Sequence, residues 1–136
     1  MKEFLRPKSK SVLKEIGHTI RLGGQVYAVE ALPDRARILM LRTGDSLHTI
    51  LGWPEPRQPW PVVLMRSQLS EIEVLHLIFD VASQLERAHW HRTLHCDIRP
   101  SNVCFCGNDT RVVERWKLID WSNARDLPVG ASTLEM

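Results

Sequence analysis

The chain has 136 residues, of which 43% are hydrophobic and 25% are charged. These values are typical of one globular domain with a buried core, and they exclude general disorder. The formal net charge is only +2 and most basic residues are dispersed, so neither nucleic acid nor a membrane surface is predicted as a partner. No run of 18 apolar residues is present, so no membrane span is predicted.

The N-terminal part is basic at first and then amphipathic. We interpret the basic residues in the range 1–10 as a solvated leading segment. Residues 8–22 place Val12 and Ile16 on one side of a short helix. Gly17 is predicted to end that helix, because glycine is a weak helix former and a common helix terminator.

The next segment has the signature of a β-hairpin. Residues 25–32 alternate between two faces, as a strand does, and Pro33-Asp34 follows as a turn. Residues 36–41 form the second predicted strand.

A turn and a short helix are predicted after the hairpin, within residues 42–51. Residues 52–61 hold four prolines and two tryptophans, so we expect a packed loop there. A proline-rich recognition ligand is the functional alternative for this loop.

A long helix is predicted over residues 70–92, and Ser70 and Glu73 have the spacing of a capping box at its start. Its apolar residues recur at helical spacing and form one stripe: Ile72, Leu75, Phe79, Ala82 and Leu85. Farther along the chain, the ranges 103–106 and 116–119 read as a second hairpin.

Polar residues with the spacing required for phosphoryl transfer lie around this second hairpin. The segment before it reads His95-Cys96-Asp97-Ile98-Arg99-Pro100-Ser101-Asn102, and the segment after it reads Leu118-Ile119-Asp120-Trp121-Ser122. A carboxylate at Asp97 can accept the proton of a substrate hydroxyl. Asn102 and Asp120 offer the oxygen ligands that Mg²⁺ prefers between nucleotide phosphates.

These two segments resemble the catalytic loop and the metal-binding D-F-G motif of the protein-kinase superfamily. The resemblance implies that Asp97 and Arg99 are catalytic residues, and that Asn102 and Asp120 bind Mg²⁺ and ATP. Arg99-Pro100 is closer to serine/threonine kinases than to tyrosine kinases. The chain departs from the motifs at Cys96 (for Arg), Trp121 (for Phe) and Ser122 (for Gly).

The resemblance also implies an α+β fold, a partial kinase-like domain truncated at both ends. Residues 1–41 are expected to be a small-lobe remnant, 42–61 the hinge and proline-rich loop, and 62–136 the start of the large lobe. We find no glycine-rich phosphate loop and no strand that resembles the one carrying the phosphate-binding lysine. Glu15 is not favoured as the glutamate that would pair with this lysine.

Two other functions remain open. The chain can be a pseudokinase-type module, inactive and bound to a protein partner. Alternatively, it can be a small-molecule phosphotransferase of the aminoglycoside or choline kinase type, families that often show the Ile-Asp-Trp found at 119–121. The expected partner is therefore a protein substrate or a protein partner, and the sequence does not predict an oligomeric state.

The cysteines bear on location and on metal binding. Three cysteines cannot all pair within one chain, which favours a reducing intracellular compartment such as the cytoplasm or nucleus. Cys104 and Cys106 could be zinc ligands, but no second ligand pair is visible in the sequence. On a strand they would face the same side, and we interpret them as small apolar fillers.

Overall fold

The computed structural model describes residues 2–5, 10–22, 26–40, 42–52, 69–107 and 114–130. Its helices and small antiparallel sheets confirm the α+β class. The predicted proline-rich loop lies outside the described residues from residue 53 onward. Contacts divide the chain into a first unit of Met1–Leu41, Ser83–Asp97 and Asp120–Met136, and a second unit of Arg42–Ala82 and Ile98–Ile119. The predicted division into small lobe, hinge and large lobe stays a prediction.

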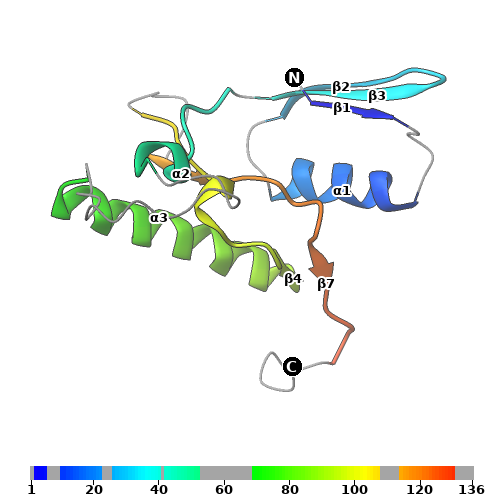
Figure 1. Ribbon diagram of the computed structural model, residues 1–136. Helices are drawn as coiled ribbons and strands as arrows, with labels where there is room; N and C mark the ends of the chain where they lie inside the picture. Colours follow the sequence, from blue (N-terminus) through cyan, green and yellow to red (C-terminus); the bar gives the residue numbers. More distant parts are fainter. Residues whose placement is uncertain are drawn as a thin grey trace, which may run out of the picture. The chain divides into compact units, whose positions relative to one another are not determined.

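The first unit contains a three-stranded antiparallel sheet in the order β1-β3-β2 (Figure 1). Its strands are β1 (Lys2–Leu5), β2 (Val26–Ala31) and β3 (Arg35–Met40). The pairing of β2 with β3 confirms the predicted hairpin, with a bulge between Val26 and Ala28. Strand β1 was not predicted. It pairs with β3, so Lys2 belongs to a strand and not to a solvated leading segment.

Helix α1 (Lys10–Arg21) covers one face of this sheet (Figure 1). The buried side chains of Ala36 and Ile38 on β3 pack against Val12 and Ile16 of the helix. The prediction that Gly17 ends the helix is wrong, because α1 continues through it to Arg21. Glycine costs about 1 kcal/mol in a helix interior, and the packing of the apolar face outweighs this cost.

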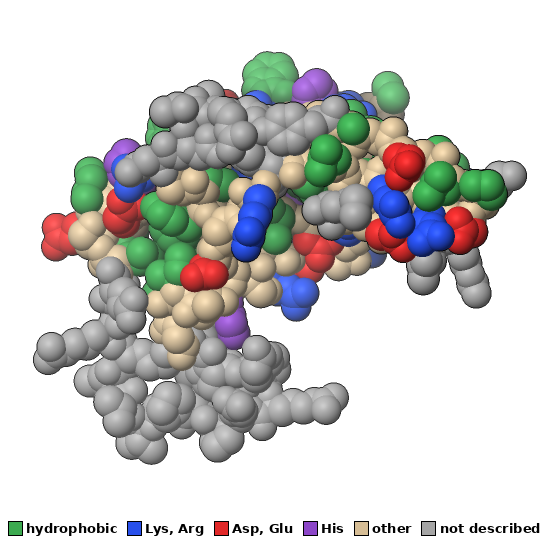
Figure 2. Space-filling view, turned by 90° about the horizontal axis from the view of Figure 1, so that it is seen from above, with side chains coloured by type: hydrophobic (Ala, Val, Ile, Leu, Met, Phe, Trp, Pro, Cys, Tyr) green, Lys and Arg blue, Asp and Glu red, His purple; other side chains and the backbone are tan. Residues whose placement is uncertain are grey.

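The other face of the sheet carries charged side chains together with the half-exposed Leu39. Figure 2 shows basic and acidic side chains side by side over the strands. Nε of Arg37 on β3 lies 2.8 Å from Oε2 of Glu3 on β1, and Nη1 of Arg37 lies 3.6 Å from Oε2 of Glu30 on β2. The alternation of a strand thus places Ala36 and Ile38 in the core and their neighbours in solvent.

The second unit contains the second predicted hairpin. Strand β5 (Val103–Phe105) pairs antiparallel with β6 (Trp116–Leu118), as expected. The short helix α2 (Leu47–Ile50) confirms the predicted helix after the turn, and the Ser46 hydroxyl caps it by accepting the N–H of Thr49. A Cβ atom on Gly44 would lie 2.6 Å from the carbonyl oxygen of Phe105, so only glycine fits this close approach.

Helix α3 (Glu71–Trp90) confirms the long predicted helix, and the N–H of Glu73 donates to the Ser70 hydroxyl at its start. Its apolar stripe does not face the core: Ile72, Leu75 and Phe79 are 58%, 62% and 71% exposed. The buried residues of α3 include instead Asp80, Gln84 and Ala88. None of the described helices is long and apolar enough to cross a membrane.

Two short strands that were not predicted complete the first unit. Strand β4 (Thr93–Leu94) follows α3 and pairs antiparallel with β7 (Arg125–Asp126). The Asp126 carboxylate accepts the Thr93 hydroxyl at 2.8 Å and lies 2.9 Å from Nε2 of the buried His18 on α1. These contacts join α1 to the strand pair that carries both candidate site segments.

Candidate functional site

The first site segment follows β4 and is fixed by His95. This histidine is 1% exposed, and its Nδ1 accepts the backbone N–H of Asp97 at 3.2 Å. Cys96 between them has φ 63°, a left-handed conformation that a non-glycine residue rarely adopts. The residue before the candidate base is therefore held in a strained conformation, and such strain is typical of functional sites.

The second site segment carries Asp120, which also has a left-handed φ, of 60°. Its Oδ1 atom accepts the Ser122 hydroxyl at 2.6 Å and the Ser122 N–H at 3.3 Å. Trp121 is buried, and its ring meets the ring of His95 edge to face at a centroid distance of 4.6 Å. The contact between the His95 and Trp121 rings thus joins the segment that carries Asp97 to the segment that carries Asp120.

Asp97 and Asp120 are both part of this unit and both partly exposed. The Asn123 side-chain amide donates a long hydrogen bond of 3.5 Å to Oδ2 of Asp97. Neither Asn123 nor the contact that Ser122 makes with Asp120 was predicted. Short polar residues just after an aspartate often bond back to nearby groups, and that signal could have revealed Ser122.

A lysine that was not among the predicted site residues lies in the same unit. Lys2 on β1 forms an ion pair with Glu15 on α1. Glu15, which the sequence did not favour as the glutamate of a kinase-type pair, is thus paired with a lysine on a strand. Phosphoryl-transfer sites of the kinase type use such a lysine and glutamate pair to hold the nucleotide phosphates.

Lys2 also acts on the candidate metal ligand. Burial raises the pKa of Asp120, but hydrogen bonds from Ser122 and the electrostatic influence of Lys2 and His95 outweigh it and hold this pKa below its usual value. Asp120 is therefore an anion near neutral pH, as a metal ligand must be. Its Oδ2 atom accepts no hydrogen bond from the described residues and can meet a cation.

Arg99 and Asn102 belong to the second unit, in the turn η1 (Pro100–Asn102) and directly before it. The N–H of Asn102 donates to the carbonyl of Arg99, and the N–H of Ile119 donates to the carbonyl of Asn102, both at 2.8 Å. Asn102 is buried and Arg99 is exposed. Asp97 and Asp120 belong to the first unit, so the roles predicted for Arg99 and Asn102 beside them stay predictions.

In the first unit, Asp120 and Lys2 are residue types that suit Mg²⁺ and a nucleotide phosphate, and Asn102 of the second unit is a further ligand type. A carboxylate with one accessible oxygen at Asp120 and an amide at Asn102 are ligand types that suit Mg²⁺. The ammonium group of Lys2, held by Glu15, suits a phosphate oxygen. Among the described residues, no group of three or more His, Cys, Asp or Glu side chains could hold a metal ion by itself.

Cys104 behaves as a buried core residue of β5. Burial raises the pKa of its thiol, while a hydrogen bond with Thr43 opposes this shift. Cys106 is half-buried, and Cys96 is exposed.

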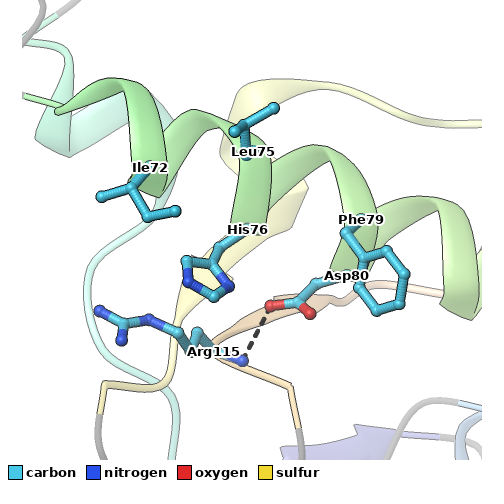
Figure 3. Close-up of a pocket in the computed structure, with 6 residues that line it drawn as sticks. All are labelled: Ile72, Leu75, His76, Phe79, Asp80 and Arg115. Carbon is cyan, nitrogen blue, oxygen red and sulfur yellow. Dashed lines mark hydrogen bonds between the residues drawn. The ribbon is translucent and has the colours of Figure 1, made fainter.

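A groove lies on the part of α3 that belongs to the second unit (Figure 3). It has a volume of about 440 Å³ and is lined by Ile72, Leu75, His76, Phe79, Asp80 and Arg115. Oδ2 of Asp80 accepts the backbone N–H of Arg115 at 2.9 Å, and the Arg115 guanidinium pairs with Glu73. The groove thus combines apolar side chains of α3 with the hydrogen-bonded residues Asp80 and Arg115.

Comparisons with known proteins point to protein kinases. The chain is 35% identical over 63 residues, 46% of its length, to the inhibitor of nuclear factor kappa-B kinase subunit alpha of Xenopus laevis. The corresponding protein of Gallus gallus is 30% identical over 63 residues. A death-associated protein kinase related protein of Drosophila melanogaster is 28% identical over 141 aligned positions, which cover 96% of this chain.

The chain spans less than a fifth of the length of these relatives: 8% of the two vertebrate proteins and 19% of the Drosophila protein. No family model matches the sequence. The comparisons therefore support a relationship to protein kinases, and they do not extend to a specific function.

Proposed function

We propose that the chain is part of a protein-kinase-like phosphotransferase that binds Mg²⁺·ATP and transfers a phosphoryl group to a serine or threonine hydroxyl of a protein. The observation that carries this proposal is the ion pair of Lys2 with Glu15, which belongs to the same compact unit as Asp120. A strand lysine paired with a helix glutamate, with a metal-type aspartate in the field of that lysine, is the set of charges that phosphoryl transfer requires.

Each residue has a definite task in this proposal. Glu15 holds the Lys2 ammonium in place, so that it can bind phosphate oxygens without a further ordering cost. Asp97 accepts a hydrogen bond from the substrate hydroxyl and takes its proton as the new bond forms. The N–H of Asp97 bonds to His95, which fixes the backbone of this base.

The metal ion supplies charge neutralisation between the phosphates when it is bound. Asp120 would hold it through Oδ2, and the metal-binding role expected of Asn102 stays a prediction. Arg99 would neutralise charge on the attacking side as the phosphoryl group moves. The predicted intracellular location agrees with a supply of ATP, and it stays a prediction.

A second function is favoured by the surface of α3. Its apolar side chains are exposed between Ile72 and Phe79, and exposed apolar patches of this kind mark protein-interaction sites. A pseudokinase-type module that binds a protein partner is therefore the alternative to catalysis.

Thermal melting with and without Mg²⁺·ATP tests the first function. We expect millimolar Mg²⁺·ATP to raise the melting temperature of the wild-type chain, because a ligand of the folded state stabilises it. Asp120→Ala should abolish this shift. Asp34→Ala, a carboxylate that is 70% exposed at a hairpin turn, should keep it.

An unchanged wild-type melting temperature at millimolar nucleotide would favour the interaction module. Where a shift is found, a transfer assay with peptide and aminoglycoside acceptors separates a protein kinase from a small-molecule phosphotransferase.

A further inference from the structure

The hydrogen bonds of Asp120 are confined to one of its two carboxylate oxygens. Both the hydroxyl and the N–H of Ser122 donate to Oδ1, and the hydroxyl contact is short, at 2.6 Å. Such an O–H bond to a carboxylate is charge-assisted and about twice as strong as a neutral one. Ser122 stands where the kinase motif has glycine, which has no hydroxyl to donate.

The backbone conformation keeps this contact in place. Asp120 has φ 60°, which turns the chain so that Ser122 follows beside the carboxylate. Trp121 between them is 2% exposed and packs on His95, so the turn is anchored on its inner side. The carboxylate therefore presents Oδ2 to a ligand and keeps Oδ1 for Ser122.

We propose that Ser122 is a positioning residue that restricts Asp120 to one metal-binding oxygen and thereby selects Mg²⁺ over Ca²⁺. Mg²⁺ takes six ligands at short distance and binds a carboxylate through one oxygen, whereas Ca²⁺ takes six to eight and often uses both oxygens of one carboxylate. A cation that approached both oxygens of Asp120 would meet the hydroxyl proton of Ser122. This inference rests on the function proposed above, since it assigns Asp120 to a metal ion.

Isothermal titration of the chain with Mg²⁺·ATP and with Ca²⁺·ATP tests the inference. The quantity of interest is the ratio of the two dissociation constants. We expect Ser122→Ala to reduce the preference for Mg²⁺ about tenfold, the factor that one charge-assisted hydrogen bond supplies. Ser122→Thr keeps a hydroxyl and should keep the wild-type ratio, as should Ser83→Ala, the matched change on α3.

The outcomes separate the two proposals. If the wild-type chain binds Mg²⁺·ATP and Ser122→Ala leaves the ratio unchanged, the inference is overturned and the proposed function stands. A wild-type chain without a preference for Mg²⁺ also overturns the inference alone. If the wild-type chain binds neither complex, both proposals are overturned. Equal melting temperatures of the variants show that a changed ratio does not come from misfolding.

Discussion

Asp80 provides the sharpest prediction about stability, because one carboxylate oxygen holds two backbone groups. Oδ2 accepts the N–H of Arg115 at 2.9 Å and the N–H of Trp116 at 3.0 Å. Asp80 is 7% exposed and Trp116 is 1% exposed, so water does not replace a lost acceptor. The two bonds fix the start of β6 on α3.

Removal of this carboxylate should be costly. A hydrogen bond to a charged group contributes about 1.5–3 kcal/mol, so Asp80→Ala should lower the free energy of unfolding by roughly 3–5 kcal/mol. Asp80→Asn keeps one carbonyl oxygen as an acceptor and should lose about half of that. Phe79→Ala is the matched control, because its side chain is 71% exposed and surface changes cost about 0.5 kcal/mol or less.

Denaturant unfolding followed by circular dichroism measures these differences. Equal slopes of the unfolding curves would show that the variants expose the same surface on unfolding. A loss below about 1 kcal/mol for Asp80→Ala would refute the reasoning, since it would mean that the two N–H groups find other acceptors.

Three further predictions concern the first unit. Gly17→Ala should raise the free energy of unfolding by about 0.5–1 kcal/mol in thermal melts, because a Cβ atom there meets nothing within 4 Å. Ile38→Ala should cost about 2–5 kcal/mol in denaturant titrations, and Leu39→Ala on the same strand much less, since these residues are 0% and 49% exposed. Burial raises the pKa of Asp126, but hydrogen bonds with His18 and Thr93 outweigh it and lower this pKa. Asp126→Asn should therefore lower the free energy of unfolding above about pH 4, and the difference from the wild-type chain should shrink as the pH falls further. A difference that does not shrink at all as the pH is lowered below about 4 would contradict this assignment.

Local patterns predicted most elements because the forces behind them are local. The alternation on either side of Pro33-Asp34 predicted the first hairpin, and the capping pair Ser70 and Glu73 predicted the start of α3. Strand β1 was not predicted because it has only four residues and because its partner strand β3 lies about 30 residues later in the sequence. The helix end predicted at Gly17 was wrong for a related reason. The free-energy cost of glycine in a helix is local, but the packing of α1 on β3 that offsets it involves residues far apart in the sequence.

The stripe on α3 shows that periodicity predicts a helix but not which side of it is buried. The sequence favoured the apolar side as the covered one. In the structure, Asp80 is covered instead, because its carboxylate serves two backbone N–H groups that need an acceptor. That need arises from β6, and the sequence of α3 contains no sign of it.

The candidate site was only partly predictable. Asp97 and Asp120 were identified from motif spacing, and their assignment to catalysis and metal binding stays a prediction. Lys2 was missed because a single lysine in a basic segment has no distinctive local pattern. Its ion pair with Glu15 exists only after β1 joins the sheet and α1 packs on it.

The affinity of the chain for Mg²⁺·ATP in a Lys2→Met variant tests the central claim most directly. Lys14→Met is the matched control, because Lys14 is an exposed lysine on α1. If Lys2 and Glu15 hold the phosphates beside Asp120, Lys2→Met should weaken binding at least about tenfold in isothermal titration, while Lys14→Met leaves it unchanged. Equal affinities of the wild-type chain and the Lys2→Met variant would contradict the account.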